Sequence, residues 1–141
     1  MNPNEPIGTD GPATNPRSRV LLVDDHETGR KSLARLLDAL GYDVTSVADG
    51  ASALQTLAAS PRFDFVLTDV RLPDFDGREV VVAARQIDPR PLIGFITGWD
   101  VDPEERHQLG VDWVFLKPLD IQDIVAKLRQ GPPARPTTGP A

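Results

Sequence analysis

Five short apolar runs alternate along this chain with segments of helical period, and this alternation restricts the fold more than any other feature. The runs predict strands at Arg19–Val23, Asp43–Val47, Phe63–Thr68, Leu92–Ile96 and Trp113–Leu116. Runs such as VLLV and FVL are apolar on both faces, which is typical of strands covered by helices on both sides. We therefore predict an α/β fold of five βα units with a doubly wound, parallel, five-stranded sheet.

The segments between the runs carry helix boundaries. A helical stripe with spacing i, i+3, i+4 and i+7 is formed by Leu33, Leu36, Leu37 and Leu40. Gly41 follows this stripe and predicts the end of the helix. Asp102 and Pro103 indicate a cap and a first-turn proline, and that helix can extend only to about Leu109. Asp120 is the predicted N-cap of the last helix.

Polar residues follow four of the predicted strands. Asp24 and Asp25 end VLLVDD, Asp69 ends DFVLTD, Thr97 ends LIGFIT and Lys117 ends DWVFLK. In a parallel sheet the carboxyl ends of the strands lie along one edge, where ligands bind. The sequence therefore predicts one site with three carboxylates, a hydroxyl and an ammonium.

Such a site has a defined chemistry. Two carboxylates about 4 Å apart repel each other by roughly 4 kcal/mol at an effective dielectric constant near 20. Three of them must raise their pKa values or recruit a cation. Mg²⁺ fits, because it takes oxygen ligands and retains several waters beside a few carboxylates and a phosphate.

The motifs VLLVDDH, TDVRLPDFDG, ITG and KP, in this order and each at a strand end, resemble the receiver domain of bacterial two-component response regulators. The resemblance covers residues 19–130 and implies a CheY-like, flavodoxin-like (βα)5 fold. It implies that Asp69 accepts a phosphoryl group from a phosphohistidine on a partner. Asp24 and Asp25 then form the acidic pair, Thr97 is the switch hydroxyl and Lys117 contacts the phosphate.

The resemblance also implies a Mg²⁺ ligand set and a cis peptide. Asp25, Asp69 and the backbone carbonyl of Arg71 are the expected direct ligands, and Asp24 acts mainly through water. The Lys117–Pro118 bond is expected to be cis, since cis bonds are a property of proline.

Two further positions flank the expected phosphoryl group. Arg71 and Trp99 lie two residues beyond Asp69 and Thr97, at receiver positions that influence how long the phosphoryl group lasts. Trp99 shields the group from water, offers an aromatic contact to a partner, or is partly buried in its own loop.

One position departs from the receiver pattern. Receivers usually carry Tyr or Phe three residues before the lysine, whereas this chain has Val114, between Trp113 and Phe115. The segment from Thr97 to Lys117 is also short, at the expense of its helix. We hypothesise a switch that does not use the usual threonine–aromatic coupling; the alternative is drift without consequence for the chemistry.

Other polar residues are predicted to lie outside the site. Asp74 and Asp76 are expected to be turn and cap residues around Gly77. His26 and His107 are expected to be solvated surface residues, and we assign them no role.

Composition excludes several function classes. The net charge is −6, from 21 acidic and 15 basic residues, and no basic block indicates nucleic-acid or membrane binding. The chain has no cysteine for a disulfide or thiolate site and no apolar run long enough for a membrane span, and residues 1–18 lack the basic segment and apolar core of a signal peptide. We expect a cytoplasmic protein.

Eight of the 14 prolines lie in residues 1–18 and 131–141, which we predict to be disordered tails around a domain at 19–130.

The leading hypothesis is a receiver domain that takes a phosphoryl group from a histidine kinase or histidine phosphotransfer protein and signals by docking or relay. We expect no enzymatic turnover apart from Mg²⁺-dependent self-phosphorylation and autodephosphorylation, and a monomer or weak dimer. The 11 residues after 130 are too few for an effector domain. Alternatives are a receiver segment of a hybrid sensor kinase or larger regulator, a non-phosphorylated pseudo-receiver, and an aspartate-nucleophile Mg²⁺ phosphatase. VLLVDDHE lacks the DxDx spacing of that phosphatase class, and no nucleotide-binding glycine motif is present.

Overall fold

The computed structural model describes residues 18–60 and 62–130. The predicted tails, 1–18 and 131–141, lie outside these ranges apart from Ser18. Within the described ranges five strands alternate with five helices: β2 (Arg19–Val23), α1 (Glu27–Ala39), β3 (Asp43–Val47), α2 (Gly50–Ala59), β4 (Phe65–Asp69), α3 (Gly77–Arg85), β5 (Leu92–Thr97), α4 (Pro103–Leu109), β6 (Trp113–Leu116) and α5 (Ile121–Gln130).

The strands form one parallel sheet in the order β3-β2-β4-β5-β6, so the predicted fold class is confirmed. Two predicted strands differ in their bounds. β4 begins at Phe65, where its ladder with Val20 of β2 begins, and extends to Asp69. β5 extends one residue further than predicted, to Thr97, which pairs with Leu116 of β6. Both extensions carry site residues into the hydrogen-bonded sheet.

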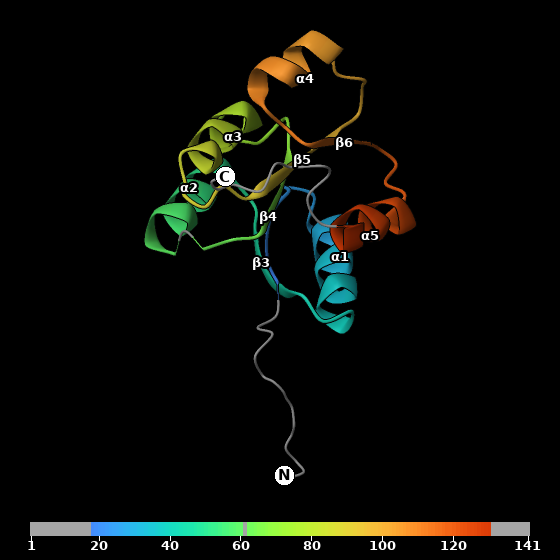
Figure 1. Ribbon diagram of the computed structural model, residues 1–141. Coiled ribbons are helices and arrows are strands. Elements are labelled where there is room, and N and C mark those ends of the chain that lie inside the picture. Colours follow the sequence, from blue (N-terminus) through green and yellow to red (C-terminus); the bar gives the residue numbers. More distant parts are fainter. Residues whose placement is uncertain (1–17, 61, 131–141) are drawn as a thin grey trace.

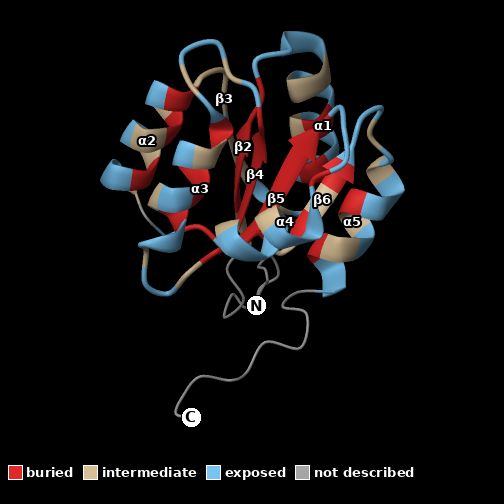
Figure 2. Ribbon diagram, turned by 90° about the horizontal axis from the view of Figure 1, so that it is seen from above, coloured by how far each residue is buried: buried red, intermediate tan, exposed pale blue. Residues whose placement is uncertain are grey.

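Helices cover both faces of the sheet. Figure 1 shows α1 and α5 on one side of the strands and α2 and α3 on the other. The core on the α1–α5 side includes Leu33, Leu37, Ile124 and Leu128. The opposite core includes residues of α2 and α3, together with Val101 and Val111, which flank α4. Because both faces are covered, β4 and β5 are buried throughout and β2 is buried from Val20 to Val23, as Figure 2 shows.

The apolar stripe of α1 is only partly buried. Leu33 and Leu37 face the core, whereas Leu36 and Leu40 are 37% and 39% exposed. Leu36 and Leu40 instead line a shallow groove shared with α5. The helix ends as predicted, because Gly41 adopts a φ of 102°, which disfavours other residues.

The predicted helix between Thr97 and Lys117 is also confirmed. The side chain of Asp102 accepts a hydrogen bond from the backbone N–H of Glu104, Pro103 is the first helical residue, and Gly110 follows Leu109 with a φ of 75°. None of the seven described residues of α4 is buried. Among the described helices, the longest of which has 13 residues, none has the length and hydropathy of a membrane span.

Candidate functional site

Asp69 is the centre of the strand-end site. Its side chain is only 6% exposed, and Oδ2 accepts a hydrogen bond of 2.8 Å from Nζ of Lys117. The two residues are 48 positions apart and come from the ends of β4 and β6. The Lys117–Pro118 peptide is cis, as the resemblance implies.

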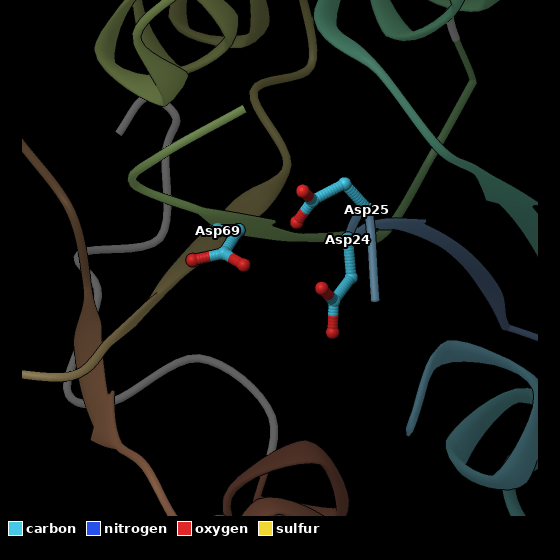
Figure 3. A group of neighbouring side chains, drawn as sticks. All are labelled: Asp24, Asp25 and Asp69. Carbon is cyan, nitrogen blue, oxygen red and sulfur yellow. The ribbon is translucent and has the colours of Figure 1, made fainter. Parts of the chain in front are cut away.

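The acidic pair lies beside Asp69. Carboxylate oxygens of Asp24, Asp25 and Asp69 all lie within 4.8 Å of one another, and Figure 3 shows the three side chains gathered at adjacent strand ends. Asp24 is buried and Asp25 is exposed. The structure therefore brings the three predicted carboxylates together. Asp69 lies at the end of β4, and the two aspartates after β2 approach it from the protein interior (Asp24) and from the solvent side (Asp25).

Backbone contacts hold Asp24 in place. Its N–H donates to the carbonyl of Val47, which extends the β2–β3 pairing by one residue. Its Oδ1 accepts from the N–H of His26 at 3.0 Å, and its carbonyl accepts from a guanidinium nitrogen of Arg30 at 2.9 Å. These bonds explain why the chain turns sharply here into α1 with one carboxylate directed inward.

The electrostatics favour neutralisation of the site. Burial raises the pKa of Asp69, the ion pair with Lys117 lowers it, and the charge of Asp24 raises it again, with a net upward shift. Burial lowers the pKa of Lys117, but the bond to Asp69 and the charges of Asp24 and Asp25 outweigh this and raise it. Lys117 is therefore protonated at neutral pH, and one ammonium does not balance the local negative charge.

Thr97 lies at the end of the neighbouring strand and is 1% exposed. Its Oγ1 accepts a hydrogen bond from the backbone N–H of Trp99 at 3.2 Å, and its carbonyl accepts from the N–H of Lys117 at 2.8 Å. A hydroxyl that accepts one bond still has a proton to donate. Thr97 is thus fixed to the same ladder that places Lys117.

The two flanking residues contact each other. The guanidinium carbon of Arg71 lies 4.7 Å from the ring centroid of Trp99, within cation–π range. Trp99 is 45% exposed, so it is partly buried, and its roles in shielding the phosphoryl group and in contacting a partner stay predictions. Arg71 also forms an isolated antiparallel bridge with Asp76. The resemblance placed both residues beside the expected phosphoryl group, but nothing in the sequence indicated that they contact each other, because they are distant in the chain.

Val114 is partly buried and packs with the core on the α2–α3 side. Trp113 and Phe115 are buried in the opposite core, with α1 and α5. Since successive strand side chains point to opposite faces, neither neighbouring aromatic takes the place of the missing ring at position 114.

The polar residues predicted to lie outside the metal cluster have structural contacts. Asp76 caps α3, as expected, by accepting from the N–H of Arg78. Asp74 accepts from the N–H groups of Gly50 and Ala51 and so caps α2, a contact that the sequence did not indicate. His26 is exposed but not without a role, because its Nδ1 caps α1.

His107 is exposed on α4, as expected.

Gly77 was expected only as a turn residue, but packing also requires a glycine there. A Cβ at this position would overlap the carbonyl oxygen of Asp69. The loop after β4 can therefore fold back against the site only if residue 77 has no side chain.

A groove of about 820 Å³ opens beside the site. Asp24, Asp25 and Lys117 form its polar end, and its remaining lining comes from α1 and from the segment after β6, namely His26, Gly29, Ser32, Leu33, Leu36, Pro118, Leu119 and Ile121. The groove is mostly apolar away from the carboxylates. It offers an amphipathic surface that leads directly to the charged cluster.

The strand order and the strand-end charges define a CheY-like α/β protein. The chemotaxis response regulator CheY4 of Vibrio cholerae has a TM-score of 0.71 with this chain at 29% identity, over 81% of this chain and 98% of CheY4. The sequence profile of the response regulator receiver domain matches residues 20–129. This chain belongs to the response regulator receiver domain family.

Two relatives show the range of this family. The response regulator receiver protein CpdR of Brucella abortus is 35% identical over 115 residues, which cover 79% of this chain and 94% of CpdR. The sensor protein EvgS of Escherichia coli K12 is 33% identical over 113 residues, which cover 79% of this chain but only 9% of EvgS.

Proposed function

We propose that this receiver accepts a phosphoryl group on the carboxylate of Asp69. The observation that carries the proposal is the buried carboxylate at the end of β4, paired with Lys117 at 2.8 Å beside two further aspartates. A carboxylate oxygen attacks phosphorus, the P–N bond of a phosphohistidine breaks, and the imidazole leaves. The product is an acyl phosphate, a known type of covalent intermediate.

The acidic cluster fits Mg²⁺. Three carboxylates within 4.8 Å, with the pKa of one raised, supply oxygen ligands and an excess of negative charge. Asp25, Asp69 and the backbone carbonyl of Arg71 would hold the ion, and Asp24 would contact it through water. Bound Mg²⁺ supplies positive charge that offsets the charge on the transferring phosphoryl oxygens.

Lys117 and Thr97 serve the phosphoryl group directly. Lys117 already contacts Oδ2 of Asp69, so its ammonium is in place to bind a phosphoryl oxygen once that carboxylate is phosphorylated. Thr97 keeps a donatable proton while it accepts from Trp99. Both groups are positioned before the reaction, which is the main requirement of electrostatic stabilisation.

The partner is a histidine kinase or a histidine phosphotransfer protein that carries a phosphohistidine. The groove of about 820 Å³ supports this, because its apolar walls lead to the carboxylates at the end where transfer must occur. An amphipathic helix fits such a surface. The phosphorylated receiver then signals by docking or passes the group onward.

Matches to CpdR over 94% of its length and to EvgS over 9% favour two contexts, a stand-alone regulator and a segment of a sensor kinase. In both contexts the proposed chemistry at Asp69 is the same. Measuring the length of the mature protein in its native cell separates them.

The test of the chemistry is intact-mass spectrometry after incubation with acetyl phosphate, with and without Mg²⁺. We expect one Mg²⁺-dependent phosphoryl adduct on the wild type and none on Asp69→Asn. Asp74→Asn is the matched control, because Asp74 is a capping residue outside the carboxylate cluster and should leave the adduct intact. An adduct on Asp69→Asn, or none on the wild type, would contradict the proposal.

A further inference from the structure

The short helix α4 is attached to the rest of the domain mainly at its ends. None of its seven described residues is buried, and the buried residues Val101 and Val111 lie before and after it. A helix of this length is not stable alone in water. Leu109, the last residue of the helix, packs against the core, and side-chain contacts with the neighbouring helix α3 hold the first part of α4.

One such contact is made by Arg78, in the first turn of α3. Its Nε and Nη2 both donate to Oε2 of Glu105 on α4, the Nε bond at 2.6 Å. Its Nη1 donates to Oδ2 of Asp76 at 2.8 Å. All three nitrogens of the guanidinium are engaged, so Arg78 joins α4 to the loop that precedes α3.

That loop leads back to the candidate site. Asp76 forms the isolated bridge with Arg71, whose guanidinium lies over the ring of Trp99. The N–H of Trp99 donates to Oγ1 of Thr97, next to the end of β4. Successive contacts therefore connect the switch hydroxyl to α4.

We propose that the phosphorylation state of Asp69 is transmitted to α4 through this chain of contacts, and not through the side chain at position 114. The inference rests on the proposed function. Val114 has no ring to move, and the rings of Trp113 and Phe115 are buried on the opposite face. The Trp99 and Arg78 contacts provide a route that needs no aromatic residue in β6.

The direction of the effect follows from charge. A phosphoryl group on Asp69 adds negative charge near Arg71 and new acceptors for Thr97. In the proposed response the guanidinium of Arg71 turns toward the phosphoryl group and leaves Trp99, the backbone of Arg71 moves with it, and the backbone bridge carries this shift to Asp76. Arg78 then loses its alignment with Glu105, and α4 is released from α3.

Hydrogen–deuterium exchange of the peptide that spans 102–110 measures this release. The probe is the full chain with Mg²⁺ and beryllofluoride, a phosphoryl mimic, compared with the metal-free chain. In the wild type we expect the mimic to speed α4 exchange about twofold to fivefold, the range expected for a partly exposed ion pair.

Two variants test the two ends of the route. Arg78→Gln should show fast α4 exchange without the mimic and no further increase with it, while acetyl phosphate still gives the Asp69 adduct. Trp99→Leu, saturated with Mg²⁺ and beryllofluoride, should keep slow basal exchange and lose the response. Lys127→Gln, which removes an i,i+4 ion pair with Asp123 on α5, is the matched control and should behave as the wild type.

The outcomes are separable. A wild-type adduct with unchanged α4 exchange would overturn this inference alone, as would a normal α4 response in both Arg78→Gln and Trp99→Leu. Failure of the wild type to form any adduct would instead overturn the proposed function. Loss of the response in both variants, with the control unaffected, supports the route.

Discussion

Replacing Asp69 with asparagine should stabilise the metal-free protein at neutral pH, although it removes an ion pair. The carboxylate oxygens lie within 4.8 Å of one another, so at an effective dielectric constant of 20 each of the other two carboxylates repels Asp69 by at least about 3.5 kcal/mol. Lys117 attracts it by about 6 kcal/mol at 2.8 Å by the same rule. A repulsion of about 1 kcal/mol remains, to which burial adds.

Asparagine keeps the shape and removes the charge, so we expect a gain on the order of 1 kcal/mol and a rise in Tm of roughly 3–6 °C. Burial raises the pKa of Asp69 in the folded protein above its value in the unfolded chain. Protonation of Asp69 therefore contributes its full stabilisation of the folded state at pH values below the unfolded pKa. It is lost as pH rises through the folded pKa. The advantage of the variant should therefore be largest at pH 7 and shrink toward zero below about pH 4.

Chemical denaturation in a chelator at both pH values measures this difference. Adding Mg²⁺ at ten times its Kd should stabilise the wild type by about 1.4 kcal/mol and the variant by clearly less. Asp43→Asn, which removes an exposed carboxylate 3.7 Å from Arg19, should stay within about 0.5 kcal/mol of the wild type. An Asp69→Asn variant that is less stable than the wild type at pH 7 in chelator would refute the reasoning.

Three further changes and one control substitution have defined outcomes. Lys117→Met removes the ammonium that contacts Asp69, so phosphorylation by acetyl phosphate should slow by about 10- to 100-fold in a mass-spectrometric time course. Gly77→Ala places a Cβ against the Asp69 carbonyl and should cost more than about 2 kcal/mol in denaturant unfolding. Gly98→Ala, where a Cβ has no neighbour within 4 Å, should cost less than about 0.5 kcal/mol. Trp99→Ala exposes the phosphoryl group and should shorten its half-life by about twofold to tenfold. The half-life is measured by mass spectrometry as the adduct disappears over time.

Each of these predictions has a contrary result. Normal uptake by Lys117→Met would show that the ammonium is not needed at the phosphate. Equal stability of Gly77→Ala and Gly98→Ala would show that the loop yields to a methyl group. An unchanged phosphoryl half-life in Trp99→Ala would leave shielding without support, and unchanged partner affinity would remove the contact role as well.

Much of the fold could be predicted because its signals are local. Buried parallel strands require apolar side chains on both faces, and runs such as VLLV meet that requirement within a few residues. Asp102 and Asp120 begin their helices, and Gly41 ends its helix, through bonds or dihedral angles that depend on near neighbours. The bounds of β4 were less accurate, because the ladder with β2 decides where pairing starts.

The apolar stripe of α1 did not indicate which of its leucines would be exposed. Leu36 and Leu40 fit the helical period as well as Leu33 and Leu37 do, yet they remain more than a third exposed. The sheet covers only part of the apolar stripe, and α5 leaves a groove over the rest. Such burial depends on the packing of a second helix that lies far along the chain.

The sequence by itself determined which polar groups lie at strand ends, because the end of a strand and the alternation of its side chains can be read from a few neighbouring residues. Asp24, Asp69 and Lys117 could therefore be assigned to one edge before any contact was known. Only the tertiary structure decided how these groups pair, as in the bond between Asp69 and Lys117 across 48 residues. It also decided the stacking of Arg71 on Trp99 and the bonds from Arg78 to Glu105, because those distances are set by sheet order and helix packing, which no local pattern encodes.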